Sequence, residues 1–434
     1  MLSDSLFEEN PKALQPYREF DMINRHILVF SGFFSLKLGK TKLELEGIIY
    51  YSLDGGLELV FEGNGERMGL AFIKANRTLS IITSNGLTGK CISPSYTSLS
   101  NGNTIYRGIV QQLFSSMRQC SCWHWSYLNM TKFHGELVTR VYENHRTIST
   151  DRLSFLCKDG TKIITENTDN KNNPKSNNQY VITHHCKLIP ANGKTIDFNS
   201  AKKYIIAFSH FISFVVGKYH SPILIEGLNK KEQHYPYYYS GYDTSRYNVI
   251  SWLPYPKDID IESLWPTFEE VWNGDDEDKA DVLNTAIHWY LEANSNSGKV
   301  EGALIMAMTG VDLMCNVILP KNEQGKMRLQ NLLKRINYKK KYDPSFMRDT
   351  RNQLVHYDED NRKKYQTLTR KQRLDCLETT LNILELAILY WLGYKIHYAD
   401  RTHANKWRGA STKMVPWSRH KSTGVTGKNN KSKN

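Results

Sequence analysis

The sequence predicts an α+β fold with a β-rich N-terminal domain followed by an all-α helical bundle. In the first half, apolar and polar residues alternate in short runs such as Leu43-Glu44-Leu45-Glu46, with the period of half-buried strands. After Pro254-Tyr255-Pro256, apolar residues recur at every third or fourth position, as on one face of a helix. We therefore divide the chain into a β-rich domain (1–256), a helical domain (257–400) and a basic tail (401–434).

The same two patterns predict individual elements. The β-rich domain should contain strands at 33–38, 42–51, 57–61, 137–142, 152–157 and 180–188, helices near 104–117 and 200–216, and an exposed polar loop at 166–178. The helical domain should contain five helices, at 278–293, 299–319, 326–336, 344–357 and 371–398. Five helices in so short a stretch predict a compact bundle, and the last helix carries its apolar stripe on Leu377, Leu381, Leu384, Ile388 and Leu392.

Charge is concentrated at the C-terminal end of the chain. The 57 Lys and Arg residues outnumber the 44 Asp and Glu residues, which gives a net charge of +13. Residues 401–434 carry nine of the basic residues and no acidic one, so the rest of the chain is close to neutral. The polar end of the tail has no apolar periodicity, and we expect it to be disordered. It is interpreted as a solvated tail, with phosphate tracking as the alternative.

The seven cysteines show no spacing typical of a disulfide framework, and the N-terminal residues include no apolar run of a signal peptide. The most apolar stretch, 204–217, is too short to span a bilayer. These observations favour reduced thiols in a cytoplasmic protein that does not enter membranes.

The helix predicted at 344–357 carries the candidate chemistry. Asp343 is a good N-cap for it, and Pro344 suits its first position. Met347, Thr350 and Leu354 fall on one apolar stripe. Helical spacing gathers polar side chains on the opposite side and its flank, namely Arg348, Arg351, Asn352 and His356.

This set of side chains suits RNA cleavage without a metal or another cofactor. The RNA 2′-hydroxyl is an internal nucleophile, so the protein must mainly move protons and stabilise phosphate charge. Histidine exchanges protons near neutral pH, and arginine offers paired donors to phosphate oxygens. We assign proton transfer to His356, charge stabilisation to Arg351 and orientation to Asn352, and we expect Arg348, Lys363 and Lys364 to bind flanking phosphates.

The run Arg351-Asn352-Gln353-Leu354-Val355-His356 resembles the Arg-polar-x-x-x-His motif of HEPN-domain ribonucleases, in a helical bundle like theirs. The order of a β-rich region and a bundle is similar to that of ApeA-like anti-phage proteins. The resemblance implies a homodimer with a shared cleft, metal-independent endoribonuclease activity and a toxin-like role in abortive-infection defence. It also suggests tRNA as the RNA, and a β-rich domain that senses a phage-encoded trigger or restrains cleavage.

Two other stretches have similar spacing, and their context argues against them. Arg140 and His145 are five positions apart, but Arg140 lies in a strand-like run without an Asn after it. Arg118 and His124 are six apart, in a segment without a clear helical face. An Arg followed by a His is therefore a weak signal unless the helix and the polar neighbour accompany it.

Several other residues keep alternative interpretations. Asp312 or Glu301 could pair with Arg351 or influence His356, or each could be an ordinary exposed carboxylate. Cys120, Cys122 and His124 could join residues 184–186 in a zinc site, although buried thiols are the simpler interpretation. The aromatic run 235–242 is expected to pack between domains, with stacking on RNA bases as the alternative.

Two further functions compete with RNA cleavage. The bundle could bind nucleic acid or a nucleotide without cutting it. Alternatively, the chain could be a carbohydrate- or protein-binding β domain with a helical dimerisation bundle, which predicts no dependence on RNA and a position 356 that tolerates substitution.

Overall fold

The computed structural model of the 434-residue chain describes most of the sequence. The described residues are 8–14, 22–23, 26–53, 57–66, 77–92, 94–98, 104–116, 119–141, 145–168, 180–240, 244, 249–254, 260–295, 299–339, 344–356, 359–403 and 410–418. The structure is α+β, with a β-rich region followed by helices, as the sequence predicts.

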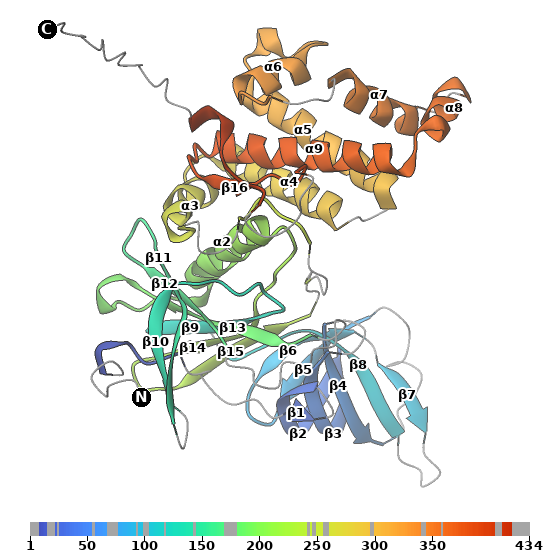
Figure 1. Cartoon of the computed structure of the whole chain (residues 1–434). Coiled ribbons are helices and arrows are strands. Elements are labelled where there is room, and N and C mark those ends of the chain that lie inside the picture. The colour runs from blue at the N-terminus through green and yellow to red at the C-terminus, as the bar shows by residue number, and fades with distance from the viewer. Residues whose placement is uncertain are drawn as a thin grey trace, which may run out of the picture.

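The first strands close into a barrel (Figure 1). Neighbouring antiparallel strands follow the order β8-β4-β3-β2-β5-β6, and a second pairing between β6 and β8 closes the ring. The strands are β2 (His26–Leu38), β3 (Thr41–Ser52), β4 (Glu58–Gly65), β5 (Thr78–Thr83), β6 (Thr88–Ile92) and β8 (Thr104–Phe114). The short strands β1 (Met22–Ile23) and β7 (Ser95–Ser98) pair with β2 and β8.

A second group of strands continues from the barrel in the same sheet. Its order away from β8 is β15-β14-β9-β13-β12-β11-β10. These strands are β9 (Cys122–Leu128), β10 (Glu136–Val141), β11 (Arg146–Leu156), β12 (Lys162–Asn167), β13 (Ile182–Ile189), β14 (Ile223–Leu228) and β15 (His234–Tyr239). The aromatic strand β15 joins the two parts, and its Tyr237 ring lies 4.1 Å from that of Phe198. In the described part of the run 235–242, Tyr235 and Tyr238 are buried and the other residues are half-buried.

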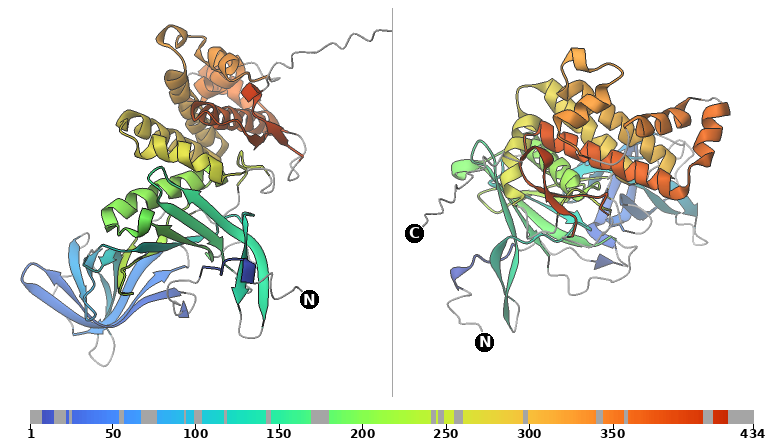
Figure 2. Two further views of the ribbon diagram at one scale, coloured as in Figure 1. Left: turned by 90° about the vertical axis from the view of Figure 1, so that its left-hand side faces the viewer. Right: turned by 45° about the horizontal axis from the view of Figure 1, so that its top comes forward.

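Helix α2 (Phe198–Val216) lies between this second group of strands and the bundle (Figure 2). Asp197 caps its start by accepting a hydrogen bond from the backbone of Ser200, and Gly217 ends it with a φ of 80°. Short 3-10 turns occur at Ala191–Gly193, Glu262–Leu264, Lys321–Glu323 and Pro416–Ser418. The helix is apolar on most sides because both layers cover it.

The C-terminal half is a helical bundle closed by a small hairpin. Its helices are α3 (Trp265–Asn273), α4 (Glu277–Asn294), α5 (Lys299–Ile318), α6 (Arg328–Arg335), α7 (Pro344–Val355), α8 (Glu359–Thr367) and α9 (Arg370–Trp391). The long helix α5 packs against both α4 and α9. The strands β16 (His397–Ala399) and β17 (Thr412–Met414) pair after α9.

The described residues form two hydrophobic cores, and their division does not follow the boundary that we expect at residue 256. The barrel strands fill one core, to which strands β9, β14 and β15 of the second group also contribute Leu128, Ile223, Leu224 and Tyr238. The second group of strands, α2 and the bundle share the other core, in which Trp265 of α3 packs edge to face on Phe208 of α2 at 5.5 Å and contacts Phe155 of β11. The bundle is therefore built on the second sheet, and the barrel is the separate unit.

The helix predicted near 104–117 is wrong, because residues 104–114 form β8. The buried residues are Thr104, Tyr106, Val110 and Leu113, so the strict alternation breaks after Val110. The pairing of β8 with β6 shifts register at this point. Such an irregularity changes the phase of the alternation and produces three- and four-residue spacings like those of a helix.

Three further expectations about boundaries are wrong. The last helix ends at Trp391 instead of residue 398, and the chain then turns at Gly393, whose φ is 72°. The predicted tail begins too early, because Arg401 is buried, β17 pairs with β16, and Trp417 packs on Tyr390. Glu166, expected in an exposed loop, is buried at the end of β12, whereas the predicted loop from 169 to 178 and residues 419–434 lie outside the described residues.

One described helix, α5, is long and apolar enough to cross a membrane by length and composition. This is weak evidence for a membrane span, because core helices pass the same test, and α5 packs against α4 and α9.

The two glycines that end α2 and α9 offer a matched test of packing at the joint between α2 and the bundle. Both have a positive φ, which costs an alanine about 1–2 kcal/mol. A Cβ at Gly217 would also lie 2.7 Å from Asn294 and 2.8 Å from Tyr290, whereas a Cβ at Gly393 meets nothing within 4 Å. We expect Gly217→Ala to lower the free energy of unfolding by about 1–3 kcal/mol more than Gly393→Ala, measured by urea denaturation. Equal losses would show that the joint is loosely packed.

Candidate functional site

The candidate residues belong to α7, which packs against α5 and α9. Met347 and Thr350 are buried and Leu354 is half-buried, as the predicted stripe requires. The Thr350 hydroxyl donates a hydrogen bond to the carbonyl of Phe346 at 2.6 Å. The helix begins at Pro344, while the predicted N-cap, Asp343, lies outside the described residues.

Arg351 and Asn352 form the polar centre of the candidate site. Nη1 of Arg351 donates a hydrogen bond to Oδ1 of Asn352 over 3.1 Å, and both side chains are half-buried. Within the described part of the chain, Nε of Arg351 is buried and has no hydrogen-bond partner. Oε1 of the nearby Gln353 is also buried and accepts no hydrogen bond from a described residue. A buried guanidinium donor without a partner is costly, so this position favours an additional acceptor such as an anion.

His356 lies one residue beyond the end of α7. Its backbone N–H still donates to the carbonyl of Asn352 at 3.0 Å, so the helical path carries the imidazole to the turn next to Asn352. The side chain is exposed, and no described residue forms a hydrogen bond with its ring. The imidazole is therefore accessible to a ligand.

The three residues expected to bind flanking phosphates are exposed on the same part of the bundle. Arg348 contacts Asp349 at 3.2 Å on α7, and Lys363 contacts Glu359 at 2.7 Å on α8. Lys364 is exposed on α8. Surface ion pairs of this kind are weak, so a phosphate can replace the carboxylate at either position.

Neither acidic candidate on α5 contacts Arg351. Asp312 forms an ion pair with Arg328 of α6 at 2.9 Å. Glu301 accepts a hydrogen bond from the Tyr365 hydroxyl at 2.9 Å and lies 3.6 Å from Arg373. These carboxylates therefore attach α6, α8 and α9 to α5.

The two other Arg and His pairs with similar spacing do not lie on a helix where the structure describes them. Arg140 lies in strand β10, as its alternating context predicts, and its guanidinium contacts Asp151 at 3.0 Å. His124 lies in β9, and Arg118 lies outside the described residues.

The two segments weighed as a zinc site do meet, because β9 and β13 are neighbours. Cys186 stands opposite Trp125, and His185 stands opposite Ser126. The alternation of strand side chains puts Cys122, His124 and His185 on one face of the sheet and His184 and Cys186 on the other, and Sγ of Cys122 lies 3.5 Å from Nε2 of His124. In the part of the chain that the structure describes, no three His, Cys, Asp or Glu side chains are placed to hold a metal ion.

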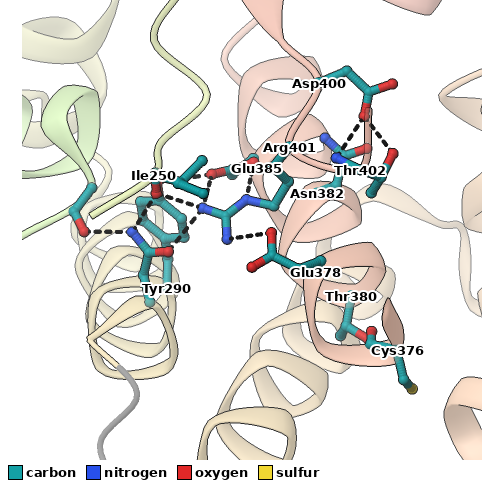
Figure 3. Close-up of polar contacts among 12 residues, drawn as sticks. Ile250, Tyr290, Cys376, Glu378, Thr380, Asn382, Glu385, Asp400, Arg401 and Thr402 are labelled. Carbon is teal, nitrogen blue, oxygen red and sulfur yellow. Dashed lines mark hydrogen bonds and ion pairs between the residues drawn. The ribbon is translucent and has the colours of Figure 1, made fainter. Parts of the chain in front are cut away.

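The sequence analysis missed a buried ionic cluster centred on Arg401 (Figure 3). The guanidinium donates to Glu385 at 2.8 and 3.1 Å, to the Oδ1 of Asn294 at 2.8 Å, and to the carbonyl of Ile250 at 2.7 Å. Glu378 adds an ion pair at 3.6 Å. Burial alone would lower the pKa of Arg401, but the neighbouring groups, Glu385 above all, raise it.

The same cluster reaches α2. The amide of Asn294 donates to the carbonyl of Gly217 at 2.7 Å and to that of Ile250 at 2.8 Å. The hydroxyl of Tyr290 donates to Glu385 at 2.9 Å. Arg401 therefore binds three separate parts of the chain, namely α4, α9 and the segment at Ile250, and Asn294 connects them to the end of α2. The aromatic residues on either side of Arg401 in the sequence, Tyr398 and Trp417, are the sequence signal that this part of the chain is folded.

Two stretches of the chain match family models. Residues 116–249 match the model described as the YopA central domain, and residues 324–413 match the one described as the YopA C-terminal domain. No curated protein and no solved structure matches the chain. The first match begins just after β8, where the barrel strands end, and covers the second sheet with α2. The second match covers α6 to β17, and therefore both the candidate site and Arg401. The chain is similar to YopA proteins over these two stretches, and neither description names a ribonuclease.

We expect Arg401→Ala to lower the free energy of unfolding by about 3–5 kcal/mol, because it leaves the carboxylate of Glu385 buried without its partner. Arg370→Ala, at an exposed position at the start of α9, serves as the control and should change it by less than about 0.5 kcal/mol. Thermal and urea denaturation measure both. Similar values for the two variants would contradict a central role of the cluster.

Buried histidines predict a loss of stability in acid. Burial lowers the pKa of His124 and His184 to about 3 and that of His185 to about 4. Their unfolded pKa is near 6.5, so the unfolded chain binds more protons and stability falls as the pH drops from about 6.5 towards 4. His185→Asn can retain the hydrogen bond with Ser126 and removes one proton site.

We expect this variant to reduce the slope of unfolding free energy against pH, in this window, by up to about 1.4 kcal/mol per pH unit. The measurement is a urea denaturation series from pH 7 to pH 4. His397→Asn, on the surface, should follow the unmodified chain. An unchanged slope in His185→Asn would mean that this ring is protonated in the folded protein.

Proposed function

We propose that the helical bundle cleaves RNA without a metal ion, at a site formed by Arg351, Asn352 and His356. The observation that carries this proposal is the pairing of the Arg351 guanidinium with the Asn352 amide, with Nε of the arginine buried and without a described partner. An accessible imidazole lies one helical turn away. Cleavage of a phosphodiester requires a donor that can bind the phosphate oxygens and a group that can move a proton. The Arg351 guanidinium and the His356 imidazole would supply these two groups.

In the proposed reaction, the RNA 2′-oxygen attacks the adjacent phosphorus and the bond from phosphorus to the 5′-oxygen breaks. The products are a 2′,3′-cyclic phosphate and a 5′-hydroxyl. His356 takes the proton of the 2′-hydroxyl, and the leaving 5′-oxygen receives a proton from water. The guanidinium of Arg351 stabilises the added charge on the non-bridging oxygens, and Asn352 holds that guanidinium in place.

The wider biological role follows from the resemblance to HEPN and ApeA-like proteins. We propose a cytoplasmic homodimer that cuts tRNA in abortive-infection defence against phage. The β-rich region would restrain the bundle until a phage-encoded protein binds. The shared core of the second sheet and the bundle supports such coupling, because a change in one alters the packing of the other.

Binding of RNA without cleavage is the second candidate. The observation that favours it is the exposed His356 ring, which no described residue orients, since catalytic imidazoles are usually held by a third group. Exposed cations at Arg348, Lys363 and Lys364 serve either function.

The test compares the intact chain with Arg351→Ala, Arg351→Lys and His356→Ala on total RNA and purified tRNA, with EDTA present. We expect discrete fragments that end in cyclic phosphate, and a loss of at least about 100-fold in rate in all three variants. Lysine keeps the charge but loses the paired donors, so Arg351→Lys distinguishes a guanidinium site from a simple positive charge.

Arg370→Ala and His397→Ala are matched controls at exposed positions of the same bundle, and both should cut normally. Circular dichroism verifies that every variant is folded. RNA binding without cleavage in the unmodified chain would favour the second candidate, whereas cleavage that survives both Arg351→Ala and His356→Ala would refute the proposed site.

A further inference from the structure

A short N-terminal segment, Pro11–Leu14, lies along the outer edge of β10, the last strand of the sheet (Figures 1 and 2). It pairs with β10 in parallel through one bridge, between Lys12 and Thr139. The backbone N–H of Ala13 donates to the carbonyl of Thr139, and the N–H of Thr139 donates to the carbonyl of Pro11, both at 2.9 Å. The segment thus acts as a minimal extra strand.

A buried ion pair holds the same segment from the side. Arg152 of β11 and Glu166 of β12 are paired, and both side chains are nearly inaccessible. The guanidinium of Arg152 donates to the carbonyl of Lys12 at 2.7 Å, and the carboxylate of Glu166 accepts from the N–H of Leu14 at 2.6 Å. The pair therefore offers one charged donor and one charged acceptor to a passing main chain.

These four hydrogen bonds all use backbone atoms of the segment. Its side chains contribute little, because Pro11 and Lys12 are exposed while Ala13 and Leu14 are only half-buried. Strand addition that depends on the main chain recognises an extended conformation, and specificity comes from side chains that fill neighbouring pockets. The side chains of the segment fill no such pockets, so its binding depends mainly on the backbone hydrogen bonds.

Strand β10 also leaves apolar surface uncovered beside the segment. Leu137 is 44% exposed and Val141 is 51% exposed, and each lies two residues from Thr139. Exposed apolar side chains on an edge strand are typical of a site for pairing with another chain. A strand with apolar side chains would bury both residues and keep all four backbone hydrogen bonds.

We propose that the edge of β10, together with the Arg152–Glu166 pair, is a docking site for an extended, apolar segment of a partner protein, and that Pro11–Leu14 occupies it until the partner arrives. The four hydrogen bonds bind the main chain of the partner. Leu137 and Val141 contact the partner's apolar side chains. The proposal does not depend on ribonuclease activity. It gives the β-rich region a defined surface at which a second protein can act.

The test opens the site without altering it. Ala13→Pro in the full chain removes the N–H that donates to Thr139 and fixes φ at residue 13, whereas Lys12→Ala leaves the backbone unchanged. The probe is a fluorescent synthetic peptide that copies residues 8–14. We expect it to bind Ala13→Pro at least 10-fold more tightly than the unmodified chain or Lys12→Ala, measured by fluorescence anisotropy. Hydrogen exchange at the Thr139 amide should accelerate in Ala13→Pro and slow again with saturating peptide.

Two altered peptides test the source of affinity and leave the protein unchanged. A peptide with Ala13→Pro lacks the donor and should bind at least 10-fold more weakly. In a peptide with Asn10→Val, extension of the register places the valine beside Leu137, and we expect several-fold tighter binding. Equal affinity of the original peptide for the unmodified chain and Ala13→Pro would overturn the proposal. So would unaltered exchange at Thr139, or equal binding of the original and the Ala13→Pro peptide.

Discussion

The buried guanidinium of Arg401 is the contact on which the arrangement of the C-terminal half depends. It binds Glu385 of α9, Asn294 of α4 and the carbonyl of Ile250, while Asn294 reaches the end of α2 at Gly217. A charge without a partner at this depth would cost several kcal/mol, so all partners must be in place together. The cluster therefore fixes the bundle on the second sheet in one orientation.

This arrangement separates the molecule into a closed barrel and a larger unit in which strands and helices share one core. The candidate site and the β10 edge lie in the larger unit, on the bundle and on the sheet respectively. The shared core gives a physical route between them, because packed helices and strands shift as units. The match to the YopA central domain begins where the barrel ends, which agrees with the same division.

Local patterns were enough where one periodicity dominated. The alternation in 42–51 predicted β3. Leu377, Leu381 and Leu384 are buried in α9 as expected, but the helix is buried on nearly all sides from Cys376 to Leu389 instead of along one stripe. The prediction failed where two patterns overlapped. In 104–114, a shift of register in β8 imitated helical spacing, and only its pairing with the barrel strands decides its state. Helix α8 is so polar that no apolar period could reveal it.

The sequence by itself determined the order of β-rich region and bundle. It also placed Arg351 and Asn352 on one helix with His356 directly after its end, because spacing along a helix is a local property. Only the tertiary structure decided which charges are paired. The nine basic residues after position 400 look like one solvated tail, yet Arg401 is buried against Glu385 and Lys413 pairs with Asp400 at 2.9 Å. Arg401 and Glu385, like Lys413 and Asp400, are separated along the chain and meet only when it folds. Burial then makes the pairing of their charges necessary.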